Sequence, residues 1–182
     1  MVDYSKEYEF LDNKNIFKEI SYDELMEFLD TFKTGLIYIG GAWCNYCQAI
    51  APYLDNIARK YNLEAVYNYD PRFINVFGEV EDLRDCKSLE NKLKYYAIVE
   101  KIKFKSKTLV QDTLISKIEV PFIMAIKNGT CVGTYSCKYV NDKYGLHAID
   151  DILHEDKAEE VTSAITELVL NLKANDKEKF AL

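Results

Sequence analysis

Apolar and polar positions in the first part of the chain predict a helix, a strand and a second helix. Apolar residues recur at helical spacing after Ser21, which forms a capping box with Glu24, and Gly35 is expected to end this helix. Residues 36–39 are apolar without interruption, which is typical of a strand that is buried on both faces. After a turn of small residues, helical spacing resumes at Cys44.

The later part of the chain predicts more strands and a final helix. Residues 65–69 have the pattern of a strand, and residues 121–127 and 130–135 are expected to pair as a hairpin around Asn128-Gly129. Apolar residues at helical spacing over residues 155–172 predict an amphipathic helix. Alternating helices and strands that end in an antiparallel pair indicate an α/β fold, with a central mixed β-sheet flanked by helices on both faces.

Residues 72–118 differ from the rest, because they are charged, rich in lysine and mostly helical in period. One helix is predicted there by the spacing of its apolar residues, which are Leu89, Leu93, Tyr96 and Val99. Residues 109–118 are a weaker second helix candidate. We therefore expect a mainly helical insertion within a single domain that spans residues 1–182.

Composition narrows the class of partner. Thirty acidic and 23 basic residues give a formal net charge of −7, which argues against nucleic acid and anionic membranes, since both bind clustered cations. No stretch approaches the roughly 18 apolar residues that cross a bilayer, and no apolar segment of a secretory signal follows the first nine residues. With an odd number of cysteines, five, the chain does not have the pattern of a disulfide-stapled secreted domain. A cytoplasmic protein is expected.

Cys44 and Cys47 are the candidate reactive residues. They lie where a buried strand gives way to a helix, and the dipole at a helix N-terminus favours the thiolate form of a cysteine. Cys44 is therefore expected to attack a substrate disulfide and Cys47 to resolve the mixed disulfide. A CxxC pair is also half of a zinc site, but the sequence has no second pair or close histidines to complete one, so no metal is expected.

Two separate motifs resemble the thioredoxin family. Residues 36–52 are similar to its core motif, with Trp43 before the first cysteine and a proline five residues after the second. The segment from Val120-Pro121 to Asn128-Gly129 is similar to the family's cis-proline loop, strand and hairpin. The resemblance covers roughly residues 17–70 and 119–172, and leaves residues 72–118 as an insertion.

This resemblance implies a thioredoxin fold and a protein-disulfide oxidoreductase. The partners would be a protein disulfide and an electron donor, either a reductase or a small thiol, with no metal or other cofactor. It implies a cis bond before Pro121 and places Trp43, Val120 and Pro121 at the substrate side of the two cysteines. The flat ring of Trp43 either forms a surface beside the cysteines on which a partner docks, or only packs against neighbouring residues.

The sequence departs from the family pattern at the group that handles the proton of the resolving thiol. Tyr38 stands where many thioredoxins have a buried aspartate, and Val66 stands where a lysine often pairs with it. Tyr38 cannot be an anionic base near neutral pH, so the proton must pass through water or another group, such as Glu64 or Asp70. The residues between the cysteines match neither the reducing nor the strongly oxidising pattern, so the redox direction stays open.

One alternative function remains beside this interpretation. The chain could be a binding module of the same fold, with inactive thiols and the insertion as partner surface. The three remaining cysteines, Cys86, Cys131 and Cys137, are expected to be buried and inert. A Cys131–Cys137 bridge is conceivable only if the chain bends between them.

Overall fold

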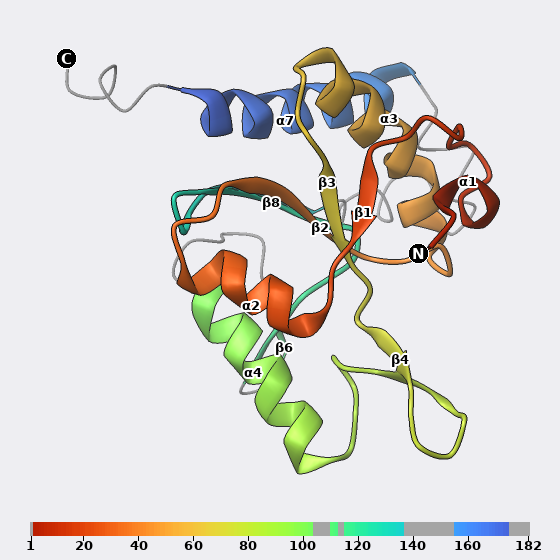
Figure 1. Cartoon of the computed structure of the whole chain (residues 1–182), viewed down its shortest axis with the longest axis vertical. Coiled ribbons are helices and arrows are strands. Elements are labelled where there is room, and N and C mark those ends of the chain that lie inside the picture. The colour runs from red at the N-terminus through yellow and green to blue at the C-terminus, as the bar shows by residue number, and fades with distance from the viewer. Residues whose placement is uncertain (1, 104–109, 113–114, 137–154, 175–182) are drawn as a thin grey trace.

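The computed structural model describes residues 2–103, 110–112, 115–136 and 155–174 of the 182-residue chain. Its centre is a mixed five-stranded sheet in the order β1-β3-β2-β8-β9 (Figure 1). The strands are β1 (Phe17–Glu19), β2 (Gly35–Ile39), β3 (Val66–Tyr69), β8 (Phe122–Lys127) and β9 (Thr130–Ser136). β1, β3 and β2 are parallel, whereas β8 runs antiparallel to β2 and β9 runs antiparallel to β8.

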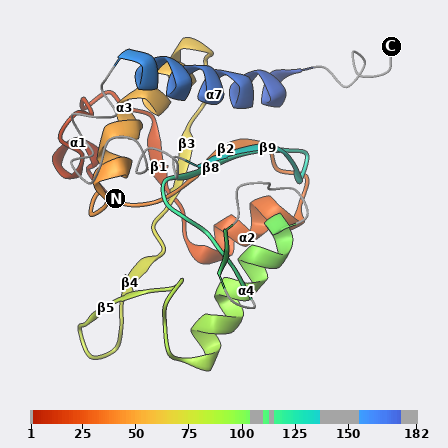
Figure 2. The same cartoon turned by 180° about the vertical axis from the view of Figure 1, so that it is seen from behind.

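Helices cover both faces of this sheet, as Figures 1 and 2 show from opposite sides. One face carries α1 (Tyr4–Glu7), α3 (Asn45–Lys60) and α7 (Glu155–Lys173). The other face carries α2 (Tyr22–Asp30) and α4 (Leu89–Lys103). The expected α/β architecture, with a mixed sheet between two layers of helices, is therefore confirmed. Within the described residues, no helix combines the length and apolar character needed to cross a membrane.

The alternation of side chains along β2 divides the interior into two cores. Leu36 and Tyr38 point into the core beneath α3 and α7, whereas Ile37 and Ile39 point into the core beneath α2 and α4. All four are buried. Ile39 pairs with both Tyr69 of β3 and Phe122 of β8. The C-terminal ends of β2 and β3 therefore lie next to the N-terminal end of β8.

The expected capping box of α2 is confirmed, but the expected end of the helix is wrong. Ser21 accepts a hydrogen bond from the Glu24 backbone and Glu24 bonds back to the Ser21 backbone. The helix ends at Asp30, because Thr31 leaves the helical conformation and takes an extended one. Gly35 is instead the first residue of β2, where a β-carbon would come within 2.9 Å of the Phe28 and Tyr67 rings.

The hairpin between β8 and β9 turns at Asn128-Gly129, as predicted. Both residues have positive φ angles, 50° and 72°, as the two central residues of a type I′ turn require. A β-carbon on Gly129 would lie 2.0 Å from the Thr31 carbonyl oxygen, so the turn also needs a glycine for space.

The segment from 72 to 118 contains two β-hairpins as well as a helix. β4 (Arg72–Ile74) pairs with β5 (Val80–Asp82), and β6 (Val110–Asp112) pairs with β7 (Ile115–Lys117). The second helix candidate, residues 109–118, is therefore wrong. β-branched residues such as Val110 and Ile115 favour the extended backbone seen here.

The helix expected in this segment exists as α4, but it is rotated from the predicted face. Its buried side chains are Tyr95, Ile98, Val99 and Ile102, which join the core that includes α2. Leu89 and Leu93, by contrast, are 73% and 57% exposed. The N-terminal turns of α4 extend beyond the core, so only its second half is packed (Figure 1).

Ile98→Ala should therefore lower the free energy of unfolding by about 2–5 kcal/mol, because it deletes a buried side chain. Leu93→Ala should change it by no more than about 0.5 kcal/mol, because Leu93 is exposed. Urea denaturation of both variants measures the difference. An equal loss in the two would mean that α4 presents the face expected from the sequence.

Candidate active site

Cys44 and Cys47 lie 3.3 Å apart at the N-terminus of α3, and both are free thiols. Cys44 is the N-cap residue and is half-buried, whereas Cys47 is fully buried within the first turn. Cys44 is therefore the more accessible of the two thiols. The chain leaves the C-terminal end of β2 through Gly40-Gly41-Ala42 and enters α3 three residues later.

The two thiols have opposite protonation behaviour. The pKa of Cys44 is lowered to about 7, first by a hydrogen bond from the Cys47 thiol, then by the backbone N–H groups of Cys47 and Tyr46, and further by the charge of Arg84. Burial raises the pKa of Cys47 well above its usual value, and the neighbouring Cys44 raises it further. Near neutral pH the pair therefore combines a thiolate at the surface with a thiol beneath it.

Gly40 lets the helix approach the end of β2 this closely, and Gly41 leaves room for Asp70 and Trp43 beside the loop. A β-carbon on Gly40 would lie 2.7 Å from Cys47 Sγ, and one on Gly41 would lie 2.1 Å from Asp70 Oδ2. Buried Asn68 on β3 secures the same loop, because its amide donates to the carbonyl oxygens of Tyr38 at 3.1 Å and Gly40 at 2.9 Å. The position of Cys47 against the end of β2 is thus fixed by packing and hydrogen bonds.

Trp43 is held in place beside the cysteines. Its indole Nε1 donates to both carboxylate oxygens of Asp70 at 3.0 Å, and the Arg72 guanidinium stacks over its ring at 3.6 Å. Trp43 is packed on one side and remains partly exposed, so packing and a docking role are compatible.

The two proton acceptors suggested by the sequence lie in different places. Asp70 bonds to Trp43 and to the Arg72 backbone, and burial raises the pKa of its carboxyl. Glu64 is exposed and precedes β3, at the end of that strand remote from the cysteines. The side chain that contacts Cys47 is instead Tyr38, through a hydrogen bond between hydroxyl and thiol.

Arg84 is a site residue that the sequence does not reveal. It follows β5, and its side chain, 12% exposed, pairs with Asp82 at 2.6 Å and donates to the Ile118 carbonyl at 3.3 Å. Its guanidinium lies 5.4 Å from the Trp43 ring centre. No local pattern marks this residue, because only the folding of residues 72–118 back onto the sheet brings it to Cys44.

The segment before β8 closes the other side of the site. The Val120–Pro121 peptide bond is cis, as expected. Cys44 Sγ lies 3.9 Å from the Val120 carbonyl oxygen, to which it donates when it is protonated. The structure therefore brings together Cys44, Cys47, Trp43, Val120 and Pro121, the set selected from the sequence.

The remaining cysteines lie away from this centre. Cys86 is buried and donates to the Leu83 carbonyl at 3.3 Å, and burial raises the pKa of its thiol. Cys131 lies in β9, half-buried, with its sulfur 3.5 Å from the Gly133 carbonyl oxygen. Cys137 is outside the described residues. The bridge between Cys131 and Cys137 that the sequence leaves open therefore also falls outside them.

In the part of the chain that the structure describes, no three histidine, cysteine or acidic side chains gather as metal ligands would. Searches against protein-family models and against curated proteins found no match to this chain.

Alkylation by iodoacetamide should modify Cys44 with a pH midpoint near 7, because the thiolate is present above this pKa and lost as the pH falls through it. Arg84→Ala should move the midpoint upward, since the cation that favours the thiolate is removed. Arg59→Ala is the matched control, because Arg59 pairs with Asp55 near the other end of α3. Peptide mass mapping locates the label. A midpoint near that of an ordinary cysteine, or an equal shift in both variants, would contradict this electrostatic account.

Proposed function

We propose that this chain is a thioredoxin-fold protein-disulfide oxidoreductase, in which Cys44 is the attacking thiolate and Cys47 the resolving thiol. The observation that carries the proposal is the contrast within the pair, a thiol of pKa about 7 at a helix N-terminus above a buried neutral one. An exchange catalyst needs this division, because one sulfur must be ionised and reachable while the other is reserved for the second step.

The fold supports the family part of the proposal. Three parallel strands continue into an antiparallel pair, the cysteines begin the helix that follows β2, and a cis proline precedes β8 opposite them. The same order of parts underlies the resemblance of the two sequence motifs to thioredoxins. Residues 72–118 enter after β3 and leave before β8, so they form an addition to this arrangement.

The reaction balances without a cofactor. Cys44 Sγ attacks the substrate disulfide, so a Cys44–substrate bond forms and one substrate sulfur leaves and takes up a proton. Cys47 then attacks Cys44 Sγ, which forms the Cys44–Cys47 disulfide and releases the second substrate thiol. The cysteine pair has lost two electrons, and a reductase or small thiol restores them. A cytoplasmic location, where such donors are abundant, is part of the proposal.

A polypeptide substrate is favoured by the surroundings of Cys44. The backbone of Val120 lies beside the sulfur, where an extended chain can pair with it. The hairpin of β4 and β5 starts at Arg72, which stacks on Trp43, and then projects from the molecule (Figures 1 and 2). Its exposed apolar side chains are Ile74, Val76, Phe77 and Val80. They offer an apolar contact for the chain that carries the disulfide.

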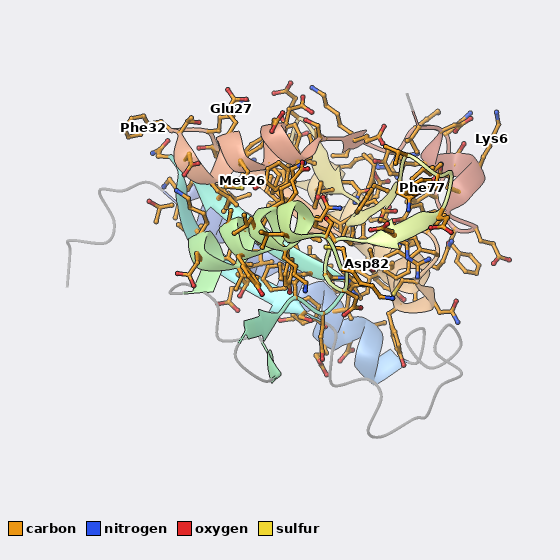
Figure 3. The ribbon with its side chains drawn as sticks, turned by 90° about the horizontal axis from the view of Figure 1, so that it is seen from below. Lys6, Met26, Glu27, Phe32, Phe77 and Asp82 are labelled. Atoms are coloured by element: carbon orange, nitrogen blue, oxygen red, sulfur yellow. The ribbon has the colours of Figure 1, made fainter. Side chains whose placement is uncertain are left out.

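This hairpin also favours the second candidate function, a binding module with inactive thiols. Phe77 is 83% exposed and lies at the outer end of the hairpin (Figure 3). In that case the apolar tip would hold a partner whether or not the cysteines are present. The retained thiol chemistry of Cys44 favours the oxidoreductase.

Cys47→Ser should accumulate a mixed disulfide between Cys44 and its substrate, because serine cannot displace the bound sulfur. Cys44→Ser should trap nothing, since Cys47 is buried, and Cys86→Ser should behave as the unmodified chain. Non-reducing gels of the three variants, together with dithiothreitol-driven reduction of insulin, measure both steps. Absence of trapping and of insulin reduction would leave the binding module.

Phe77→Asp should slow the reduction of insulin severalfold and leave the reaction with a small aromatic disulfide unchanged, because only the polypeptide reaches the hairpin. The matched control is Phe32→Asp, since Phe32 is 90% exposed and lies far from the hairpin (Figure 3). Equal rates for both variants on insulin would exclude the hairpin from substrate binding.

A further inference from the structure

Two tyrosine hydroxyls lie in a row beneath the resolving cysteine. Tyr38 is fully buried on β2, and its hydroxyl hydrogen-bonds to the Cys47 thiol. The hydroxyl of Tyr8, which is 1% exposed, lies 3.3 Å from that of Tyr38. A β-carbon on Gly40 would meet both Cys47 Sγ and the Tyr38 hydroxyl, at 2.7 and 3.0 Å, which shows how closely these groups surround one point.

The rings that carry these hydroxyls are fixed by packing. Phe17 of β1 meets the Tyr38 ring edge-on at 5.7 Å between centroids and the Tyr8 ring at 6.1 Å. The segment that holds Tyr8 is itself tied to α3, because Gln48 Nε2 donates to the carbonyl oxygens of Glu7 and Ala42 at 2.9 and 2.8 Å. The hydroxyls therefore cannot move away from Cys47 without disturbing the core.

To resolve the mixed disulfide, Cys47 has to lose its proton in surroundings that raise its pKa. Burial raises its pKa, and Cys44 adds to this effect, whereas the hydrogen bond with Tyr38 acts in the opposite direction. The other titratable groups around the hydroxyl row are Tyr4 and Asp70, which act on Tyr8 through their charges. Burial keeps the Tyr38 hydroxyl protonated by raising its pKa well above the usual value, so Tyr38 can donate a hydrogen bond but cannot serve as a base.

We propose that Tyr38 donates a hydrogen bond to the Cys47 thiolate as it resolves the mixed disulfide, and that Tyr8 positions the Tyr38 hydroxyl for this task. The inference rests on the proposed function and deepens it. Tyr38 is a catalytic residue because it touches the reacting sulfur, and Tyr8 acts through Tyr38. The pair thus takes the place of the carboxylate that the family pattern would put at residue 38.

A pair of hydroxyls suits this task better than one. In the mixed disulfide Cys44 carries no charge, so the Cys47 thiol is free to donate to Tyr38, and Tyr38 donates to Tyr8. When Cys47 ionises, both hydroxyls rotate, so that Tyr8 donates to Tyr38 and Tyr38 donates to the sulfur. Since a hydroxyl can donate and accept, the buried oxygen of Tyr38 keeps a partner in both states.

The step balances as follows for each turnover. The Cys47 sulfur forms a bond to Cys44 Sγ, the bond from Cys44 to the substrate sulfur breaks, and the substrate thiolate leaves. The proton lost by Cys47 passes to solvent, from which an alkyl leaving thiolate takes up a proton whereas an aromatic one stays ionised, and both tyrosines keep their own protons.

The two chemical steps can be timed separately with a substoichiometric amount of an aromatic disulfide whose thiolate is coloured. Its first thiolate is released when Cys44 attacks and its second when Cys47 resolves. Tyr38→Phe should leave the first release unchanged, slow the second by roughly tenfold or more, and move its pH midpoint upward, because a hydrogen bond to a charged sulfur is lost. Tyr8→Phe should slow the second release less, with the same upward shift.

Tyr69→Phe is the matched control, because Tyr69 is a buried tyrosine of β3 in the core on the opposite face of the sheet. A second release that is unchanged in Tyr38→Phe, or a slowing of both releases alike, overturns the inference. If Tyr38→Phe does not fold, the rate and the pH midpoint of the second release in Tyr8→Phe test the inference instead. If the unmodified chain itself gives no second release, the proposed function fails, and the inference about Tyr38 falls with it.

Discussion

The first turn of α3 lies against the end of β2 so closely that no side chain fits between them. This contact, made possible by Gly40, determines the rest of the site. It buries Cys47 against Tyr38 and leaves Cys44 at the open N-terminus of the helix, next to free backbone N–H groups. Two chemically identical thiols thereby acquire opposite properties from one geometric constraint, the thiolate where a substrate can reach it and the thiol where only the partner sulfur can.

Groups from three distant parts of the chain adjust this centre. Residues 72–118 contribute Arg84, whose charge favours the Cys44 thiolate, and Arg72, which stacks on Trp43. The segment before β8 places the Val120 carbonyl beside Cys44. The N-terminal segment brings Tyr8 to Tyr38. Residues from the segment between β3 and β8 and from the N-terminal segment therefore contribute to the surroundings of the two thiols as well as to the packing of the sheet.

What could be predicted from the sequence depended on local pattern. The capping box of α2, the buried strand β2, the Asn128-Gly129 turn and the pairing of Cys44 with Cys47 each have a signal within a few residues. The face of α4 could not be predicted, because which of its apolar residues are buried depends on how far the helix overlaps α2. The places of Arg84 and Tyr8 beside the cysteines could not be predicted either, because each reaches the site only through tertiary contacts. The sequence marks Tyr38 only as a departure from a family pattern, because its hydrogen bonds to Cys47 and Tyr8 depend on the fold.

The central claim is that Cys44 and Cys47 form one reversible dithiol–disulfide couple. Equilibration of the unmodified chain with glutathione buffers of graded potential, followed by acid quenching, alkylation and peptide mapping, tests this most directly. The account predicts one two-electron transition, confined to Cys44 and Cys47, with a potential in the range of roughly −270 to −120 mV that spans reducing and oxidising members of this class. A pair that stays reduced throughout this range, or a disulfide that instead recruits Cys86, would contradict it.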